Sequence, residues 1–93
     1  MRAFGVEEFA ALEGESFSLV LGERTITVNL AGVRRLPDSG REGGAFVLDW
    51  HGPYEPVLPQ DIYVFRHGDA EFEIFIVPIA QTRDGTRYEA VFN

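Results

Sequence analysis

The segment FEIFIVPIAQTRDGTRYEAVFN, residues 72–93, decides the fold. Along TRYEAVFN, the apolar residues Tyr88, Ala90 and Phe92 occupy every second position, which is typical of a strand with one face in a core. Asp84-Gly85 separates this strand from a long apolar run, and such a pair favours a hairpin turn. We therefore interpret the ending as the last hairpin of a β-core and predict that deleting residues 88–93 prevents folding.

The faces of this hairpin distinguish two possible turns. A two-residue Asp84-Gly85 turn would set Ile76 and Phe92 on opposite faces. A three-residue turn through Arg83-Asp84-Gly85, with Gly85 left-handed, sets Phe92 opposite Ile76 and Tyr88 opposite Ala80. The second arrangement gathers the apolar side chains on one face, so we predict the three-residue turn.

The opposite face of the same hairpin region is also apolar. An uncovered apolar surface of this kind marks a docking surface or needs a cover from the same chain. We expect the N-terminal helix or a partner protein to cover it. Its members are Ile62, Phe75, Val77 and Ile79.

The strand before this hairpin, DIYVFRH, turns at Gly68-Asp69. A two-residue turn there pairs Arg66 with Glu71 on one face and Phe65 with Phe72 on the other. An ion pair outside and an aromatic pair inside predict a half-buried hairpin.

The N-terminal half is predicted to contain another hairpin, in which a two-residue turn again pairs apolar side chains on one face. A Gly-first turn at Gly22-Glu23 joins SFSLVL to RTITVNL and pairs Leu19 with Ile26 and Phe17 with Val28. The alternation slips beyond Gly32, which predicts a β-bulge there.

The strand AFVLDW follows a flexible Gly-rich loop at 37–44 and places Phe46, Leu48 and Trp50 on one face. Asp49 points the other way, and partly buried carboxylates in sheets are usually paired. We predict a structural ion pair of Asp49 with Arg34 or Arg35 of the preceding strand.

Residues 6–12 are expected to form one short helix, since Val6, Phe9 and Ala10 follow i, i+3, i+4 spacing and Gly14 can end it. With strands from about residue 16 to 93, residues 1–93 are predicted to be a single domain. The predicted fold class is all-β, a small antiparallel barrel or sandwich of about six strands with one short N-terminal helix.

Composition excludes several functions. The chain has no cysteine and no lysine, which rules out thiol catalysis, disulfides and Schiff-base chemistry. The net charge of −7 disfavours nucleic acid and anionic membranes as partners. We see no apolar run that could span a membrane and no signal sequence, so the expected location is the cytoplasm or an assembly made there.

No constellation of residues predicts catalysis, a cofactor or a metal. His51 and His67 lie at strand ends without recognisable ligand spacing, and Glu71 and Glu73 share a solvated strand face. We therefore expect no catalytic, cofactor-binding or metal-binding residues and no enzymatic activity. The candidate interaction surface combines the rigid HGPYEPVLPQ loop with the apolar outer face, although Trp50 also fits the core: Trp50, His51, Tyr54, Phe75 and Val77.

The segments LPQDIYVFRH, FEIFIVPIA and DGTRYEAVFN, together with an opening pattern of Phe9, Leu12, Gly14 and Phe17, resemble a family of small bacterial proteins classed as a domain of unknown function. The resemblance spans nearly the whole chain. The family brings no established activity and no catalytic residues. Because its members tend to be encoded near proteins with phage tail-collar domains, the resemblance implies a phage-tail-like or surface-fibre assembly.

Two functions follow from these observations. The leading hypothesis is a non-enzymatic interaction or assembly module that binds another protein or a second copy of itself, with an open strand edge at the C-terminus as one way to pair. The alternative is a small-ligand-binding β-barrel whose mouth is lined by the loop around His51 and Tyr54. An enclosed cavity would favour the alternative, and an interior filled by aromatic side chains would favour the first.

Overall fold

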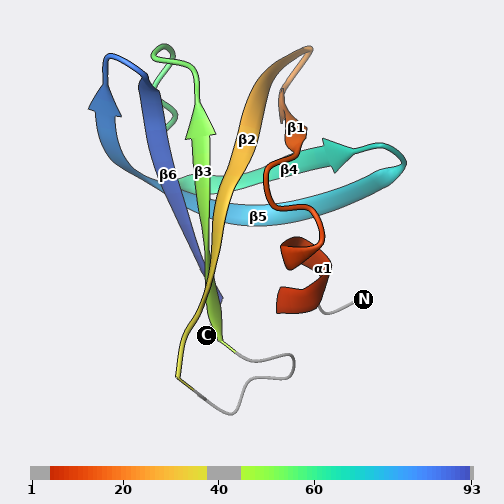
Figure 1. Cartoon of the computed structure of the whole chain (residues 1–93). Coiled ribbons are helices and arrows are strands. Elements are labelled where there is room, and N and C mark those ends of the chain that lie inside the picture. Colours follow the sequence, from red (N-terminus) through yellow and green to blue (C-terminus); the bar gives the residue numbers. More distant parts are fainter. Residues whose placement is uncertain (1–4, 38–44, 93) are drawn as a thin grey trace.

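The chain folds into a closed barrel of six antiparallel strands with one short helix at its lower end in Figure 1. The structure is a computed structural model and describes residues 5–37 and 45–92. The predicted loop at 37–44 lies outside the described residues except for Pro37, as does Asn93. The elements are α1 (Val6–Ala10), β1 (Ser16–Leu21), β2 (Arg24–Arg35), β3 (Phe46–Gly52), β4 (Asp61–His67), β5 (Ala70–Thr82) and β6 (Gly85–Phe92).

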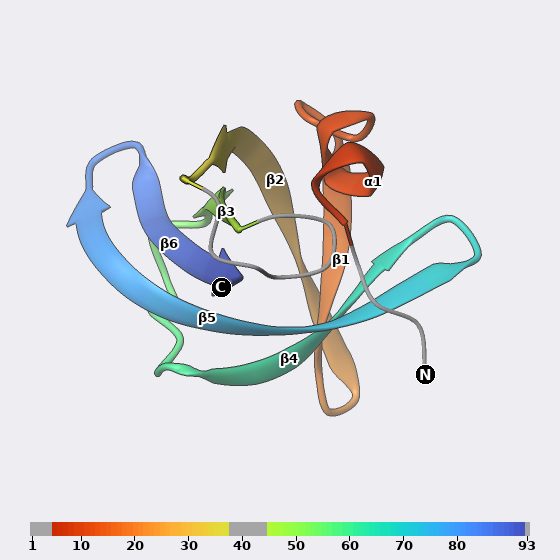
Figure 2. The same cartoon turned by 90° about the horizontal axis from the view of Figure 1, so that it is seen from below.

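The strand order around the barrel is β1-β2-β3-β6-β5-β4, with β4 returning to β1. Within it, β1, β2 and β3 are consecutive hairpin-connected neighbours and β4 lies beside β1, which is the Greek-key order. The connection from β3 to β4, residues 53–60, therefore crosses one end of the barrel. Figure 2 shows β5 as one long curved strand that runs from its turn with β4 to its turn with β6. The all-β prediction with one short N-terminal helix is confirmed, and the architecture is a barrel.

Two predicted hairpins have the expected register. Leu19 pairs with Ile26 and Phe17 with Val28 across the turn at Gly22-Glu23. Across the Gly68-Asp69 turn, the β4–β5 pairs include Arg66 with Glu71 and Phe65 with Phe72. Gly22 and Gly68 have φ values of 62° and 59°, the left-handed conformation that a glycine adopts without steric cost.

The prediction of a three-residue turn in the last hairpin is wrong. Thr82 pairs directly with Gly85, so the turn consists of Arg83 and Asp84, and Tyr88 faces Pro78 instead of Ala80. A register shift between Pro78 and Ala80 leaves Ile79 as the extra residue of a bulge. The extra residue of the bulge shifts the pairing of β5 with β6 by one position, just as one extra residue in the turn would have done. The same side chains of β5 therefore still face the core.

The bulge predicted beyond Gly32 in β2 lies slightly earlier. The register with β3 shifts between Leu30 and Gly32, which leaves Ala31 as the extra residue. Gly32 follows directly and faces Asp49. A Cβ on Gly32 would lie 3.3 Å from Asp49 Oδ2, so the glycine leaves room for that carboxylate.

The barrel interior is filled mainly by large apolar side chains, and aromatic rings contact one another through it. Phe46 and Phe92 stack with ring centroids 4.5 Å apart, and Trp50 meets Phe17 edge to face at 4.9 Å. The largest fully buried side chains are Trp50, Tyr88, Phe9, Phe17, Phe46, Phe65, Leu19, Leu30, Leu48, Ile74, Ile76 and Val28.

The helix α1 closes the lower end of the barrel and does not cover the outer face of the last hairpin. Phe9 is fully buried, and its ring lies 5.2 Å from that of Phe72 and 6.0 Å from those of Phe46 and Phe92. It thus fills the place where β5 and β6 diverge, because the last residue pair between these two strands is Val77 with Glu89. The expectation that α1 covers Phe75 and its neighbours is wrong, because the apolar side chains of the helix, Val6 and Phe9, pack against the core.

Candidate functional site

The five residues of the predicted interaction surface do not form one site. Trp50 lies inside the barrel, His51 and Tyr54 lie near the end crossed by residues 53–60, and Phe75 and Val77 lie on the outer face of β5. The structure therefore separates a core residue, a loop region and an outer sheet face.

Trp50 belongs to the core and not to a surface. Its side chain is 1% exposed, and its ring lies 4.5 Å from that of Phe65 and 4.9 Å from that of Phe17. The period-two alternation of β3 explains this position, since Phe46 and Leu48 face inward as well. The indole Nε1–H has no hydrogen-bond partner among the described residues.

Side chains of the last hairpin hold the loop of residues 53–60 in place. The Tyr54 carbonyl accepts hydrogen bonds from Gln81 Nε2 at 2.9 Å and from the buried Thr86 Oγ1 at 3.1 Å. Tyr88 reaches up from the core, and its hydroxyl accepts the Leu58 N–H at 3.0 Å. Leu58 is 5% exposed, so the loop also contributes to the core. This loop is a well-anchored cap of the barrel.

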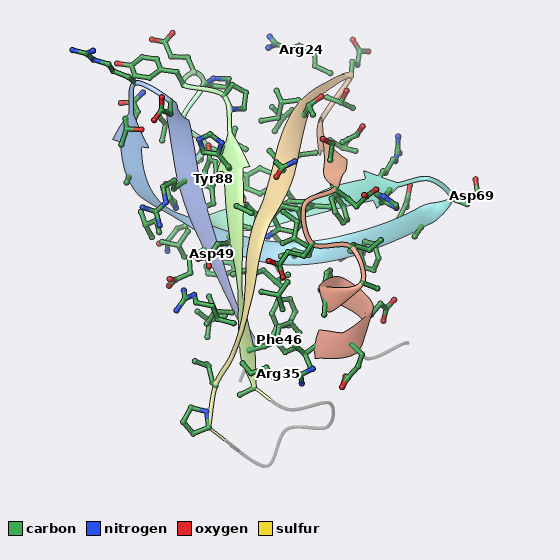
Figure 3. All side chains as sticks on the ribbon, in the orientation of Figure 1. Arg24, Arg35, Phe46, Asp49, Asp69 and Tyr88 are labelled. Atoms are coloured by element: carbon green, nitrogen blue, oxygen red, sulfur yellow. The ribbon has the colours of Figure 1, made fainter. Side chains whose placement is uncertain are left out.

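An open groove runs beside this loop, between the β1–β2 turn and the end of β5. The groove has a volume of about 760 Å³ and is open to solvent. Both polar and apolar side chains line it: Leu21, Arg24, Glu55, Pro56, Val57 and Gln81. Figure 3 places Arg24 at this end of β2, far from Asp69 at the tip of the β4–β5 hairpin. The groove lies outside the barrel, whose interior is occupied by aromatic side chains.

Four of the apolar side chains on the outer face of β4 and β5 form what we call the apolar strip: Ile62, Phe75, Val77 and Ile79. Ile62 is 58% exposed, Phe75 49% and Ile79 45%, whereas Val77 is half-buried. Ile62 pairs with Phe75 across the two strands, so the strip is continuous from β4 to β5. Val91 on β6 is 50% exposed as well, and it pairs with Val47 of β3.

Asp49 forms the predicted ion pair. Arg34 donates from Nε to Asp49 Oδ2 at 2.9 Å and from Nη2 to Asp49 Oδ1 at 3.2 Å, and Nη2 also donates to Glu89 Oε2 at 3.0 Å. The hydrogen bond and charge of Asp49, followed by those of Glu89, raise the pKa of Arg34 above its ordinary value. One guanidinium thus links β2, β3 and β6 on the barrel surface, and both carboxylates have a structural role.

The remaining polar candidates are also engaged locally. Arg66 Nε donates to Glu71 Oε2 at 2.7 Å, and His67 Nε2 lies 3.3 Å from Glu15 Oε1. His51 lies on β3, where Asn29 and Arg87 are its cross-strand neighbours. Within residues 5–37 and 45–92, no group of three or more metal-ligating side chains is close enough to hold an ion.

Two charged residues lie beside the strip. Glu73, which the sequence already places on a solvated strand face, is two residues before Phe75 on the outer face of β5. Arg87, which the sequence alone did not single out, lies beside Ala80 at the other end. The alternation of TRYEAVF already places Arg87 outward, because Tyr88 and Thr86 are buried. The signal was therefore present, but only the register shows that Arg87 lies next to β5.

A family model described as "Domain of unknown function (DUF6916)" matches residues 4–92. The chain belongs to the DUF6916 family. Comparison with curated proteins and with solved structures finds no significant match. The described part of the chain has no helix with the length and apolar character needed to cross a membrane.

Proposed function

We propose that this member of the DUF6916 family is a non-enzymatic protein-interaction or assembly module that docks through the apolar strip. The observation that carries the proposal is the exposure of Ile62, Phe75 and Ile79 on adjoining positions of a rigid sheet. Contiguous exposed apolar side chains on a small protein favour a docking role over a purely structural one.

The energetics favour a partner that covers the strip. Removing a half-exposed aliphatic or aromatic side chain from water contributes about 1 kcal/mol, since full burial contributes roughly 1.5–3 kcal/mol. Sheet residues lose little conformational freedom on docking, because the barrel already fixes their backbone. The interior is filled by aromatic rings, which supports a binding surface outside the barrel.

The resemblance described above supports a finer version of this proposal, in which the partner belongs to a phage-tail-like or surface-fibre assembly made in the cytoplasm. The net charge of −7 supports a protein partner over nucleic acid or an anionic membrane. A small-ligand site is the second candidate, and the groove beside residues 53–60 is the observation that favours it.

The test combines binding and surface substitution. The purified chain is titrated by calorimetry with the products of the genes next to its own, and the Ile62→Thr/Phe75→Thr variant is compared with Val57→Thr. Val57 is 44% exposed in the groove, so its variant is a matched control for losing an exposed apolar side chain. Threonine retains strand propensity at the two strip positions.

We expect the strip variant to lose binding by tenfold or more, at about 1.4 kcal/mol per tenfold, and the Val57 variant to bind normally. Normal binding by the strip variant, or a strict monomer that binds none of these proteins, contradicts the proposal. Loss of binding with Val57→Thr alone assigns the docking role to the groove.

A further inference from the structure

The two ends of the apolar strip carry opposite charges that nothing in the described chain neutralises. Glu73 is exposed on the outer face of β5, two residues before Phe75. Arg87 is exposed on the outer face of β6 and pairs with Ala80, just beyond Ile79. The neighbouring carboxylates, in contrast, are already paired: Glu71 forms an ion pair with Arg66, and Glu89 forms one with Arg34.

This pattern is self-complementary. In a symmetric dimer the same patch serves both subunits, so each charge meets the residue that the twofold axis places opposite it. If the two β5 strands run antiparallel across the interface, Glu73 of one copy meets the Arg87 end of the other. If they run parallel, Glu73 meets Glu73 and Arg87 meets Arg87, and like charges oppose association.

We propose that the apolar strip binds a second copy of this chain, with the two β5 strands antiparallel and Glu73 of each copy paired with Arg87 of the other. The inference rests on the proposed function and names its partner. Glu73 lies seven residues from Ala80 along β5, about 20 Å of strand, so the two ion pairs would flank a central apolar contact.

The dimer is expected to be weak. A standard interface covers about 800 Å² per partner, roughly a seventh of the 5747 Å² surface of this molecule. Four apolar side chains on a convex barrel cover less than that, and each copy carries a net charge of −7, which opposes close approach. Association should therefore depend on protein concentration in the micromolar range.

Charge exchange provides the test, because it separates specific pairing from overall repulsion. Arg87→Glu changes the net charge from −7 to −9, and Glu73→Arg changes it from −7 to −5. The double variant restores −7, since the two changes cancel. All four proteins and Phe75→Thr are examined by sedimentation equilibrium across a range of micromolar concentrations, with circular dichroism to check that each is folded.

We expect the parent and the double variant to approach twice the chain mass of 10.4 kDa, and both single variants and Phe75→Thr to dissociate at least fivefold more readily. If repulsion alone mattered, Glu73→Arg would associate more tightly than the parent, and that result overturns the proposed pairing. A dimer unaffected by Phe75→Thr also overturns it. A parent protein that remains monomeric at every concentration overturns self-association. That result leaves the proposed docking role to be decided by the calorimetric titration with other proteins.

Discussion

Single residues in this barrel connect the core to the loop that covers one end. Tyr88 is fully buried, yet its hydroxyl accepts the N–H of Leu58 in the loop of residues 53–60. Gly85 has a φ of 139°, and a Cβ there would overlap the Gly52 carbonyl oxygen. The first contact anchors the loop, and the second explains why only glycine fits where β6 begins beside β3.

The hydroxyl of Tyr88 can be tested by Tyr88→Phe. The substitution leaves the Leu58 N–H buried without a partner, which should reduce the free energy of unfolding by about 1–3 kcal/mol. Chemical denaturation monitored by circular dichroism measures the change. Tyr54→Phe is the control, since the Tyr54 side chain is half exposed and should alter stability by less than about 0.5 kcal/mol. Equal effects of the two variants would argue against the anchor.

Tyr63 predicts a dependence of stability on alkaline pH. Burial, followed by the charge of Asp61, raises the pKa of Tyr63 above its ordinary value of 10.0, and its hydroxyl donates to the Pro59 carbonyl at 2.7 Å. The unfolded chain therefore releases this proton at lower pH than the folded protein does. The contribution of protonated Tyr63 to the free energy of unfolding is complete below pH 10.0, and it is lost as the pH rises through the pKa of Tyr63 in the folded protein. Between pH 9 and 11, roughly, we expect denaturation midpoints to fall more steeply for the parent than for Tyr63→Phe, and parallel curves would contradict this.

At the scale of elements, the sequence predicts the strands and most of their faces, because each strand has one side in the core and alternates with period two. The alternation pattern does not predict the backbone where two different irregularities would turn the same side chains inward. A longer turn at Gly85 and a bulge at Ile79 place the same side chains inward, and the alternation cannot distinguish them. It also cannot decide whether Trp50 serves the core or a surface, since an aromatic ring suits both.

The position of Pro78 explains why its missing N–H costs little stability. The β4–β5 pairs end at Asp61 with Ile76, so β4 offers no partner opposite Pro78. On the other side Pro78 faces Tyr88, next to the bulge, where ladder hydrogen bonds are already irregular.

The C-terminal strand should be indispensable for folding. Deleting residues 88–93 removes the buried Tyr88 and Ala90 and the ring of Phe92 that stacks on Phe46. We expect the shortened chain to lack a cooperative thermal transition by circular dichroism. Val91→Thr is the control, because Val91 is 50% exposed and its replacement leaves the core intact. A cooperative transition with a similar midpoint after the deletion would mean that this strand is not part of the core.

At the scale of the whole molecule, charge and apolar surface are distributed differently. Acidic residues give the chain its net charge of −7, and Arg34 ties two of them, Asp49 and Glu89, to one side of the barrel. The apolar strip lies on β4 and β5, away from α1, which closes the barrel end (Figure 1). The sequence located Phe75 and Val77 on this face, but it could not show that α1 would leave them exposed, since that depends on where the helix packs.

The most direct test of the docking role is a site-resolved one. Amide and methyl NMR signals of the labelled protein are followed as its concentration rises, and then as each neighbouring gene product is added. We expect the shifting signals to belong to the apolar strip, with Glu73 and Arg87 at its ends: Ile62, Phe75, Val77 and Ile79. Shifts confined to residues 53–60 and the adjoining groove, with the strip unchanged, would contradict it.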